Sequence, residues 1–221
     1  MAEMKFKFTI QPYQTEAVDS VAGVFAGQPF NDHFTYRRDV EIRRDVTNWM
    51  LSDEELYMGF ANAKVQLDSS QLLENIRRIQ TRNNIKLSDS LKSGGQGVCS
   101  LDVEMETGTG KTYVYIKTIF ELNKQYGWSK FIVVVPSIAI REGVKKSFEM
   151  MKDHFRECYG KQARSFVYDS KSLDKIDQFS QSADINVMII NIQAFNARGK
   201  DARRIRTELD DFGSRRPIDV I

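Results

Sequence analysis

The sequence predicts an α/β fold: a three-layer architecture in which helices flank a parallel sheet on both faces. Three observations predict it. Apolar runs typical of strands alternate with longer helical segments from residue 98 onward. A glycine-rich turn joins the first of these strands to the first helix. The 221 residues, 41% of them hydrophobic, suffice for one large core but hardly for two full domains.

Ahead of this region, the chain predicts one helix and a polar insertion. Pro12 can open a helix, because apolar residues then recur at three- and four-residue spacings. Residues 28–97 are polar and hold one helix-like stretch at 72–79, which Ser69 or Ser70 can cap. The predicted domains are therefore an N-terminal helical region (1–27), a polar, partly helical insertion (28–97) and the α/β domain (98–221).

The α/β domain predicts its elements in a fixed order. Strands are expected at residues 98–105, 131–135, 165–167 and 185–191, and a further strand begins at 218–221. Helices are expected at residues 111–126, closed by Gly127, and near 138–155. Asp102 and Glu104 conflict with the first strand, because a central parallel strand is usually apolar on both faces. Packing of that face against the polar insertion would remove the conflict.

Composition excludes several classes of function. The net charge of +2 offers no global attraction for nucleic acid, so any DNA contact must come from a local patch. Cys99, Cys158, His33 and His154 lack the spacing of a zinc site or a disulfide framework. No apolar run approaches the roughly 20 residues of a membrane span, and the start lacks the plan of a secretory signal. We expect a cytoplasmic protein without a membrane partner.

The most informative segment follows the first predicted strand and opens the next helix. It reads Met105-Glu106-Thr107-Gly108-Thr109-Gly110-Lys111-Thr112. Gly108 and Gly110 let the backbone curl so that N–H groups point at phosphate oxygens, and the helix adds the positive end of its dipole. Lys111 is placed to reach the β- and γ-phosphates, and the Thr112 hydroxyl to bind magnesium. The alternative is an ordinary turn ahead of an ordinary helix.

A second group of candidate residues follows two later strands. Pro136 and Ser137 end one strand at its carboxyl edge, where ligand sites of open α/β sheets gather. Ser137 and Arg141 can hold phosphates without reading a base sequence. Ser137 can equally well cap the next helix, with Arg141 a solvated surface charge. Asn191 and Gln193 are open to a similar choice, because they can simply close a turn.

Four stretches in order along the chain resemble motifs of the first, RecA-like motor domain of superfamily 2 helicases and translocases. They are residues 10–18, 104–112, 133–144 and 191–196. Met105, in place of the usual Gly, and the insertion residues 72–80 and 83–86 resemble more narrowly the restriction (Res) subunit of type III restriction–modification enzymes. The family often has Arg where this chain has Gln11.

The resemblance implies a function and a set of roles. Gln14 would recognise adenine, and the residues Glu106, Thr107, Gly108, Thr109, Gly110, Lys111 and Thr112 would bind ATP with Mg²⁺. The residues Pro136, Ser137, Arg141, Asn191 and Gln193 would lie near the DNA backbone. In the intact enzyme, ATP would drive a motor along double-stranded DNA before endonuclease cleavage. The expected partners are that DNA and a modification methyltransferase subunit.

Hydrolysis needs an acidic pair that this chain does not supply. In the helicase family an Asp-Glu pair directly follows an apolar strand; here Asp53-Glu54 lies in a polar stretch and Asp210-Asp211 follows a charged segment. We therefore expect an amino-terminal fragment that binds ATP and hydrolyses it poorly. The alternatives are a non-catalytic nucleotide- or DNA-binding remnant, or another superfamily 2 motor such as an RNA helicase or a type I restriction motor. Met105 and the type III-like insertion argue against another superfamily 2 motor.

Overall fold

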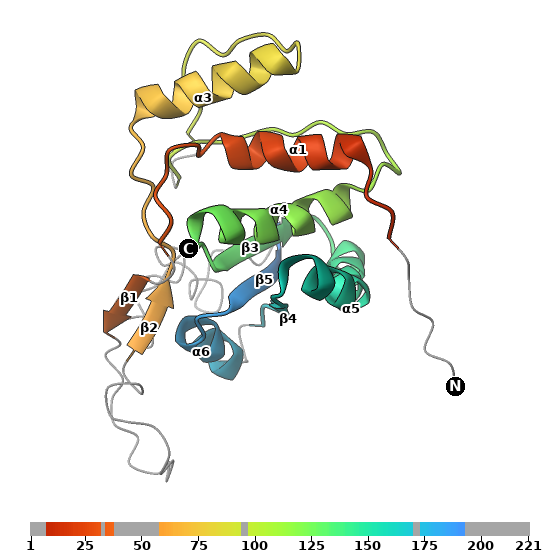
Figure 1. Ribbon diagram of the computed structural model, residues 1–221. Coiled ribbons are helices and arrows are strands. Elements are labelled where there is room, and N and C mark those ends of the chain that lie inside the picture. Colours follow the sequence, from red (N-terminus) through yellow and green to blue (C-terminus); the bar gives the residue numbers. More distant parts are fainter. Residues whose placement is uncertain (1–7, 32–33, 38–57, 94–96, 170–172, 193–221) are drawn as a thin grey trace. The chain divides into compact units, whose positions relative to one another are not determined.

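The computed structural model describes residues 8–31, 34–37, 58–93, 97–169 and 173–192. It is an α/β protein with a parallel three-stranded sheet and flanking helices, as predicted (Figure 1). The chain divides into two compact units: the first holds residues 1–31 and 64–127, and the second holds 32–63 and 128–221. The division at residues 27 and 97, drawn from sequence patterns, stays a prediction.

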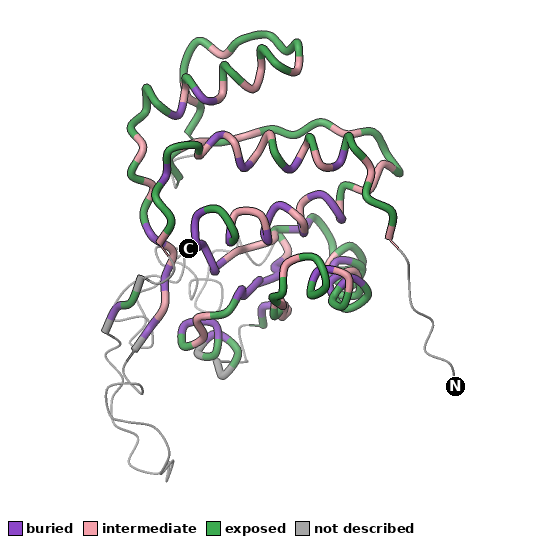
Figure 2. The backbone as a smooth tube through the Cα atoms, in the orientation of Figure 1, coloured by how far each residue is buried: buried purple, intermediate pink, exposed green. Residues whose placement is uncertain are grey.

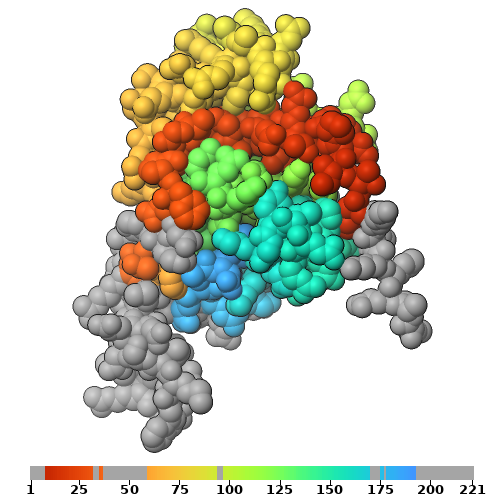
Figure 3. Space-filling view, viewed as in Figure 1, coloured from red at the N-terminus to blue at the C-terminus, as the bar shows by residue number. Residues whose placement is uncertain are grey.

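Three helices build the first unit: α1 (Pro12–Gly23), α3 (Ser69–Arg82) and α4 (Lys111–Tyr126). The predicted bounds of α4 are confirmed, and Gly127 ends it in the left-handed conformation with φ 80°. In Figures 1 and 3, α1 (red) lies between α3 (yellow) and α4 (green). Helix α1 is therefore the element that joins the other two.

Both apolar packing and buried hydrogen bonds hold α1 in place. Val18 and Ala22 are buried on it, and the Tyr126 hydroxyl of α4 donates to the Ala22 carbonyl at 2.8 Å. On the other side, the buried Asn75 amide of α3 donates to the carbonyls of Val24 and Ala26 at 3.0 and 2.9 Å. Carbonyls near the C-terminal end of α1, which have no partner within the helix, are thus satisfied by its neighbours.

The cap of α3 differs from the prediction. Neither Ser69 nor Ser70 caps the helix; Asp68 does, and its carboxylate accepts the backbone N–H groups of Ser70 and Gln71 at 2.8 and 2.9 Å. The Gln71 side chain accepts in return from the Asp68 N–H at 3.0 Å, which completes a capping box. The Ser70 hydroxyl, together with these N–H groups, lowers the pKa of Asp68.

The predicted strand at 98–105 is wrong. Residues 99–106 adopt no regular structure, and Val98 and Val103 are 48% and 49% exposed. Within the described residues no strand pairs with this segment, and a strand without a ladder leaves its backbone groups to water. Asp102 and Glu104 are exposed, and this is compatible with an irregular segment although it conflicted with a central strand.

The sheet of the second unit consists of β3 (Lys130–Val135), β5 (Ile185–Asn191) and β4 (Ala163–Val167), in that spatial order and all parallel. Strand β5 is central and buried over six of its seven residues, as the continuous apolar run predicted (Figure 2). The long helix α5 (Ile138–Tyr159) packs against the sheet. The predicted strand at 218–221 lies outside the described residues.

Three further elements of the second unit were not predicted: helix α6 (Leu173–Gln181) and the antiparallel pair β1 (Phe34–Arg37) and β2 (Met58–Ala61). They share one core with the sheet, where Ile176 and Phe179 of α6 meet Met188 and Ile190 of β5. Tyr36 of β1 belongs to the same core. Segments far apart in the sequence thus bury one face of the parallel sheet.

A buried lysine caps the C-terminal end of α6. Lys130, the first residue of β3, is 0% exposed, and its ammonium donates to the carbonyls of Phe179 at 2.6 Å and of Ser182. It also lies 5.1 Å from the centre of the Phe179 ring. Burial lowers the pKa of Lys130 to about 7, although the carboxylate of Asp184 acts in the opposite direction. When it is protonated, the lysine supplies the positive charge that the C-terminal end of a helix favours.

Candidate nucleotide-binding site

The glycine-rich segment forms a turn that leads directly into the N-terminus of α4. Gly108 and Gly110 have φ values of 84° and 88°, in the left-handed region that side chains with a Cβ rarely adopt. Gly110 is the N-cap of α4, and Lys111 is its first residue. A Cβ added at Gly108 would meet nothing within 4 Å. The backbone curl expected from the two glycines is confirmed, with open space beside the first.

One carbonyl holds this turn together. The Glu106 oxygen accepts from the Thr109 hydroxyl at 2.6 Å, from the Thr109 N–H at 3.4 Å and from the Lys111 ammonium at 2.8 Å. Lys111 is exposed and lies at the positive end of the α4 dipole. Two sources of positive potential therefore coincide at the turn, and this is the arrangement that binds a polyanion.

Helix α1 contacts the turn through two consecutive side chains. The Tyr13 hydroxyl and the Gln14 Nε2 both donate to the Thr109 carbonyl, at 3.1 and 2.9 Å. Gln14 is buried and lies so close to Gly110 that a Cβ there would be 2.5 Å from Nε2. A side chain at 110 would therefore be strained at this φ and would also displace the Gln14 amide.

The hydroxyl proposed for magnesium lies in the first turn of α4. Thr112 is partly buried and neighbours Tyr115, whose pKa is raised by burial and lowered to a lesser degree by the Thr112 side chain. The Tyr115 hydroxyl is therefore protonated at neutral pH.

These donors fit the triphosphate of ATP. Residues 106–112 offer the N-terminus of a 16-residue helix, one ammonium group, and a glycine beside open space. Thr112 would hold the magnesium ion that accompanies the phosphates. Mg-ATP, when bound, would supply the phosphoanhydride bond that is hydrolysed.

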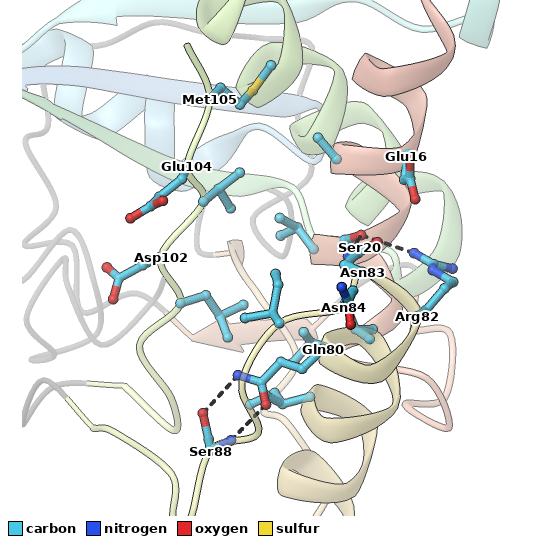
Figure 4. A pocket seen from close by; sticks show the side chains of 18 of the residues that line it. Glu16, Ser20, Gln80, Arg82, Asn83, Asn84, Ser88, Asp102, Glu104 and Met105 are labelled. Atoms are coloured by element: carbon cyan, nitrogen blue, oxygen red, sulfur yellow. Dashed lines mark hydrogen bonds between the residues drawn. The ribbon is translucent and has the colours of Figure 1, made fainter.

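A cavity of about 960 Å³ opens next to the turn, within the first unit. Its wall runs from Met105, Glu106 and Thr109 past Tyr13 to side chains of α1 and α3 (Figure 4). Figure 4 shows the carboxylates of Asp102 and Glu104 directed away from α1 and α3. Residues 38–57 and 94–96 of the insertion lie outside the described residues, so the suggestion that the face of Asp102 and Glu104 packs against the insertion stays a prediction.

Hydrogen bonds stiffen the far wall of this cavity. The Gln80 amide of α3 donates to the Ser88 hydroxyl and accepts from the Ser88 N–H, both at 2.9 Å. Arg82 and Asn83 donate to the Ser20 hydroxyl of α1, at 3.0 and 3.2 Å (Figure 4). The loop after α3 is thereby tied both to α3 and to α1.

The second group of candidate residues belongs to the second unit. Strands β3 and β5 are parallel, with Val135 opposite Asn191, so Pro136 and Ser137 follow β3 at the edge where Asn191 ends β5. The structure thus brings Ser137 and Asn191 to the same end of the sheet. Gln193 lies outside the described residues.

The helix-cap alternative holds for Ser137 without excluding a ligand. Its hydroxyl oxygen accepts from the Ile140 N–H at 3.3 Å, which makes it the N-cap of α5. The hydroxyl proton is still available to donate. Arg141 pairs with the Glu142 carboxylate at 3.1 Å, and its side chain is 23% exposed. The guanidinium has five N–H donors, so one carboxylate does not exhaust it.

Comparison with known proteins decides the family. The family model described as type III restriction enzyme, res subunit, matches residues 64–213. This chain belongs to that family. The Res subunit of the type III restriction–modification enzyme EcoP15I from Escherichia coli is 32% identical over 205 residues, which cover 86% of this chain and 19% of that protein.

Two further relatives have the same description. The EcoPI Res subunit of Escherichia phage P1 is 29% identical over 211 residues, covering 90% of this chain and 20% of that protein. The StyLTI Res subunit of Salmonella typhimurium (strain LT2) is 38% identical over 86 residues, 38% of this chain and 9% of that protein. The chain spans about a fifth of the length of the first two.

Sequence reasoning missed two residues of this Res-family chain. Tyr13 lies within the motif-like stretch 10–18 but received no role of its own, and its contact with Thr109 joins residues 96 positions apart. Lys130 reads as an ordinary charge at the start of an apolar strand, and only the fold of α6 reveals its burial.

No helix among the described residues is long and apolar enough to cross a membrane.

Proposed function

We propose that this chain is the ATP-binding first motor domain of a DNA-dependent translocase that serves a type III restriction endonuclease. The observation that carries the proposal is the turn at 106–112, where two left-handed glycines and Lys111 precede the N-terminus of α4. Membership of the Res family supports it. ATP and Mg²⁺ are the proposed ligands.

The chain's own groups have distinct roles in this proposal. The backbone N–H groups of residues 107–112 bind the phosphates, and Lys111 exchanges its bond to the Glu106 carbonyl for the β- and γ-phosphates. Thr112 holds Mg²⁺, and Gln14 lies near the adenine. None of these steps needs a large movement, because Lys111 already lies at the turn.

Calorimetric titration with Mg-ATP tests the proposal. We expect saturable binding that Lys111→Ala abolishes. The variant removes the ammonium that lies at the turn, bonded to the Glu106 carbonyl, and that would bind the phosphates. Lys124→Ala is the matched control: it removes the same charge from the exposed last turn of the same helix and should leave the affinity unchanged. Equal loss in both variants, or no binding by the folded wild-type chain, would refute the assignment.

Turnover by this chain alone should be weak or absent. Hydrolysis requires an acidic residue that holds magnesium and orients water, and no Asp-Glu pair follows an apolar strand in the sequence. A steady phosphate-release rate that Lys111→Ala removes would contradict this expectation. Binding without turnover, in contrast, is also what a non-catalytic nucleotide-binding module would show.

The proposed nucleic-acid contact lies at the carboxyl edge of β3 and β5. The free donor of Ser137 and the guanidinium of Arg141 are suited to phosphate oxygens of double-stranded DNA, with Asn191 at the adjacent strand end. Pro136 and Gln193 complete this proposed set. A modification methyltransferase subunit is the proposed protein partner, since the relatives are subunits of restriction–modification enzymes.

A further inference from the structure

The Thr109 carbonyl is an unusual point of the nucleotide site, because it accepts two side-chain hydrogen bonds from one helix. Tyr13 Oη lies 3.1 Å and Gln14 Nε2 2.9 Å from it. A carbonyl oxygen has two lone pairs, so both donors can be satisfied at once. The first turn of α1 therefore fixes the direction of this one carbonyl.

Fixing that carbonyl also fixes the next N–H group. The described peptide bonds are trans, and in a trans peptide the C=O and the following N–H point in opposite directions. The bonds from α1 hold the Thr109 oxygen toward α1, so the Gly110 N–H is aimed away from α1. With Gly110 at φ 88° the peptide has little steric restraint of its own. The side chains of α1 therefore supply the restraint that the glycine lacks.

The Tyr13 bond is not needed to hold α1 in place. Val18 and Ala22 are buried, the Tyr126 hydroxyl donates to the Ala22 carbonyl at 2.8 Å, and the Lys117 ammonium donates to the Thr15 hydroxyl at 3.0 Å. Tyr13 itself is 46% exposed, so its ring adds little to the core. Its hydroxyl can be removed without unfolding the helix.

We propose that Tyr13 is a positioning residue of the phosphate-binding turn: its hydroxyl, bonded to the Thr109 carbonyl, aims the Gly110 N–H at the polyphosphate. This inference rests on the proposed function, since it presumes that the turn binds Mg-ATP. Tyr13 acts through the peptide between Thr109 and Gly110, and the phosphate end of the ligand is what it affects. The adenine end is unaffected.

Tyr13→Phe tests the inference, because it keeps the ring and deletes the hydroxyl. We expect Mg-ATP and inorganic tripolyphosphate, each titrated calorimetrically with Mg²⁺, to bind about five-fold more weakly, because the peptide that the hydroxyl fixes must then be ordered on binding, at a cost of about 1 kcal/mol. The melting temperature should change little. Tyr126→Phe is the matched control: it deletes a buried hydroxyl that bonds α1 far from the turn, so it should lower the melting temperature and leave both affinities unchanged.

The outcomes separate this inference from the function beneath it. Unchanged affinity in Tyr13→Phe, with wild-type binding intact, would overturn the role of Tyr13 and leave the proposed function standing. A loss confined to Mg-ATP, with tripolyphosphate unaffected, would mean that the tyrosine contacts the nucleoside, and would also overturn it. No Mg-ATP binding by the folded wild-type chain would overturn both.

Discussion

Replacing Gly110 with alanine should damage the nucleotide site in two ways at once. The residue has φ 88°, where an L side chain is strained by roughly 1–2 kcal/mol. The new Cβ would also lie 2.5 Å from Gln14 Nε2, a distance that real atoms do not adopt. Gln14 would have to leave the Thr109 carbonyl, at a cost of about 1 kcal/mol for the lost hydrogen bond.

The two effects add to a loss of about 2–3 kcal/mol in the free energy of unfolding. For a chain of this size, that corresponds to a fall in melting temperature of about 5–10 °C. Affinity for Mg-ATP should fall as well, because the Thr109 carbonyl would lose a partner that orients the turn. Thermal denaturation followed by circular dichroism, together with calorimetric titration, measures both quantities on the same sample.

Gly160→Ala is the matched control for the strain alone. Gly160 ends α5 with φ 67°, and a Cβ there would meet nothing within 4 Å. It should therefore cost only about 1–2 kcal/mol and leave Mg-ATP binding unchanged. Equal destabilisation by Gly110→Ala and Gly160→Ala, with equal affinity for Mg-ATP, would refute the argument that Gln14 requires a glycine at 110.

Two further predictions concern the packing of each unit. Burial lowers the pKa of Lys130 to about 7, so between about pH 7 and 10 the unfolded chain binds one more proton than the folded chain. The free energy of unfolding should therefore rise with pH in this range, by up to about 1.4 kcal/mol per pH unit. In urea denaturation across this range Lys130→Met should lose that slope, and an unchanged slope would contradict the burial of the lysine. Asn75→Ala should lower the free energy of unfolding by about 2–3 kcal/mol, since it leaves the carbonyls of Val24 and Ala26 without donors. Glu74→Ala, which removes only an exposed pair with Arg78, should change it by less than about 0.5 kcal/mol; similar effects of the two variants would argue against the buried amide.

Local signals predicted the parts of the fold that depend on neighbours in the sequence. Helix α4 begins at Lys111 and ends before Gly127 because a glycine turn and a left-handed glycine bound it. Strand β5 contains the apolar run Val187–Ile190 because it is buried on both faces. The turn at 105–112 likewise carries its geometry in the positions of Gly108 and Gly110.

The errors arose where long-range partners decide the outcome. The run at 98–105 has the composition of a strand, but a strand exists only with a neighbour to complete its ladder, and the described residues supply none. Strands β1 and β2 pair across twenty intervening residues, and their polar surroundings offered no local signal. The cap of α3 was a local error instead: Asp68, not Ser69 or Ser70, is the N-cap, because Asp68 and Gln71 together form a capping box.

By itself, the sequence determined the family, the glycine-rich turn and the helix that follows it, because glycine φ preferences and apolar periodicity act over a few residues. The tertiary structure alone decided which side chains reach that turn from a distance. Tyr13 and Gln14 contact Thr109 only because α1 packs on α4. Lys130 binds the carbonyl of Phe179 only because α6 packs next to the start of β3. Such contacts depend on the direction in which a packed element presents its side chains, which no short stretch of sequence encodes.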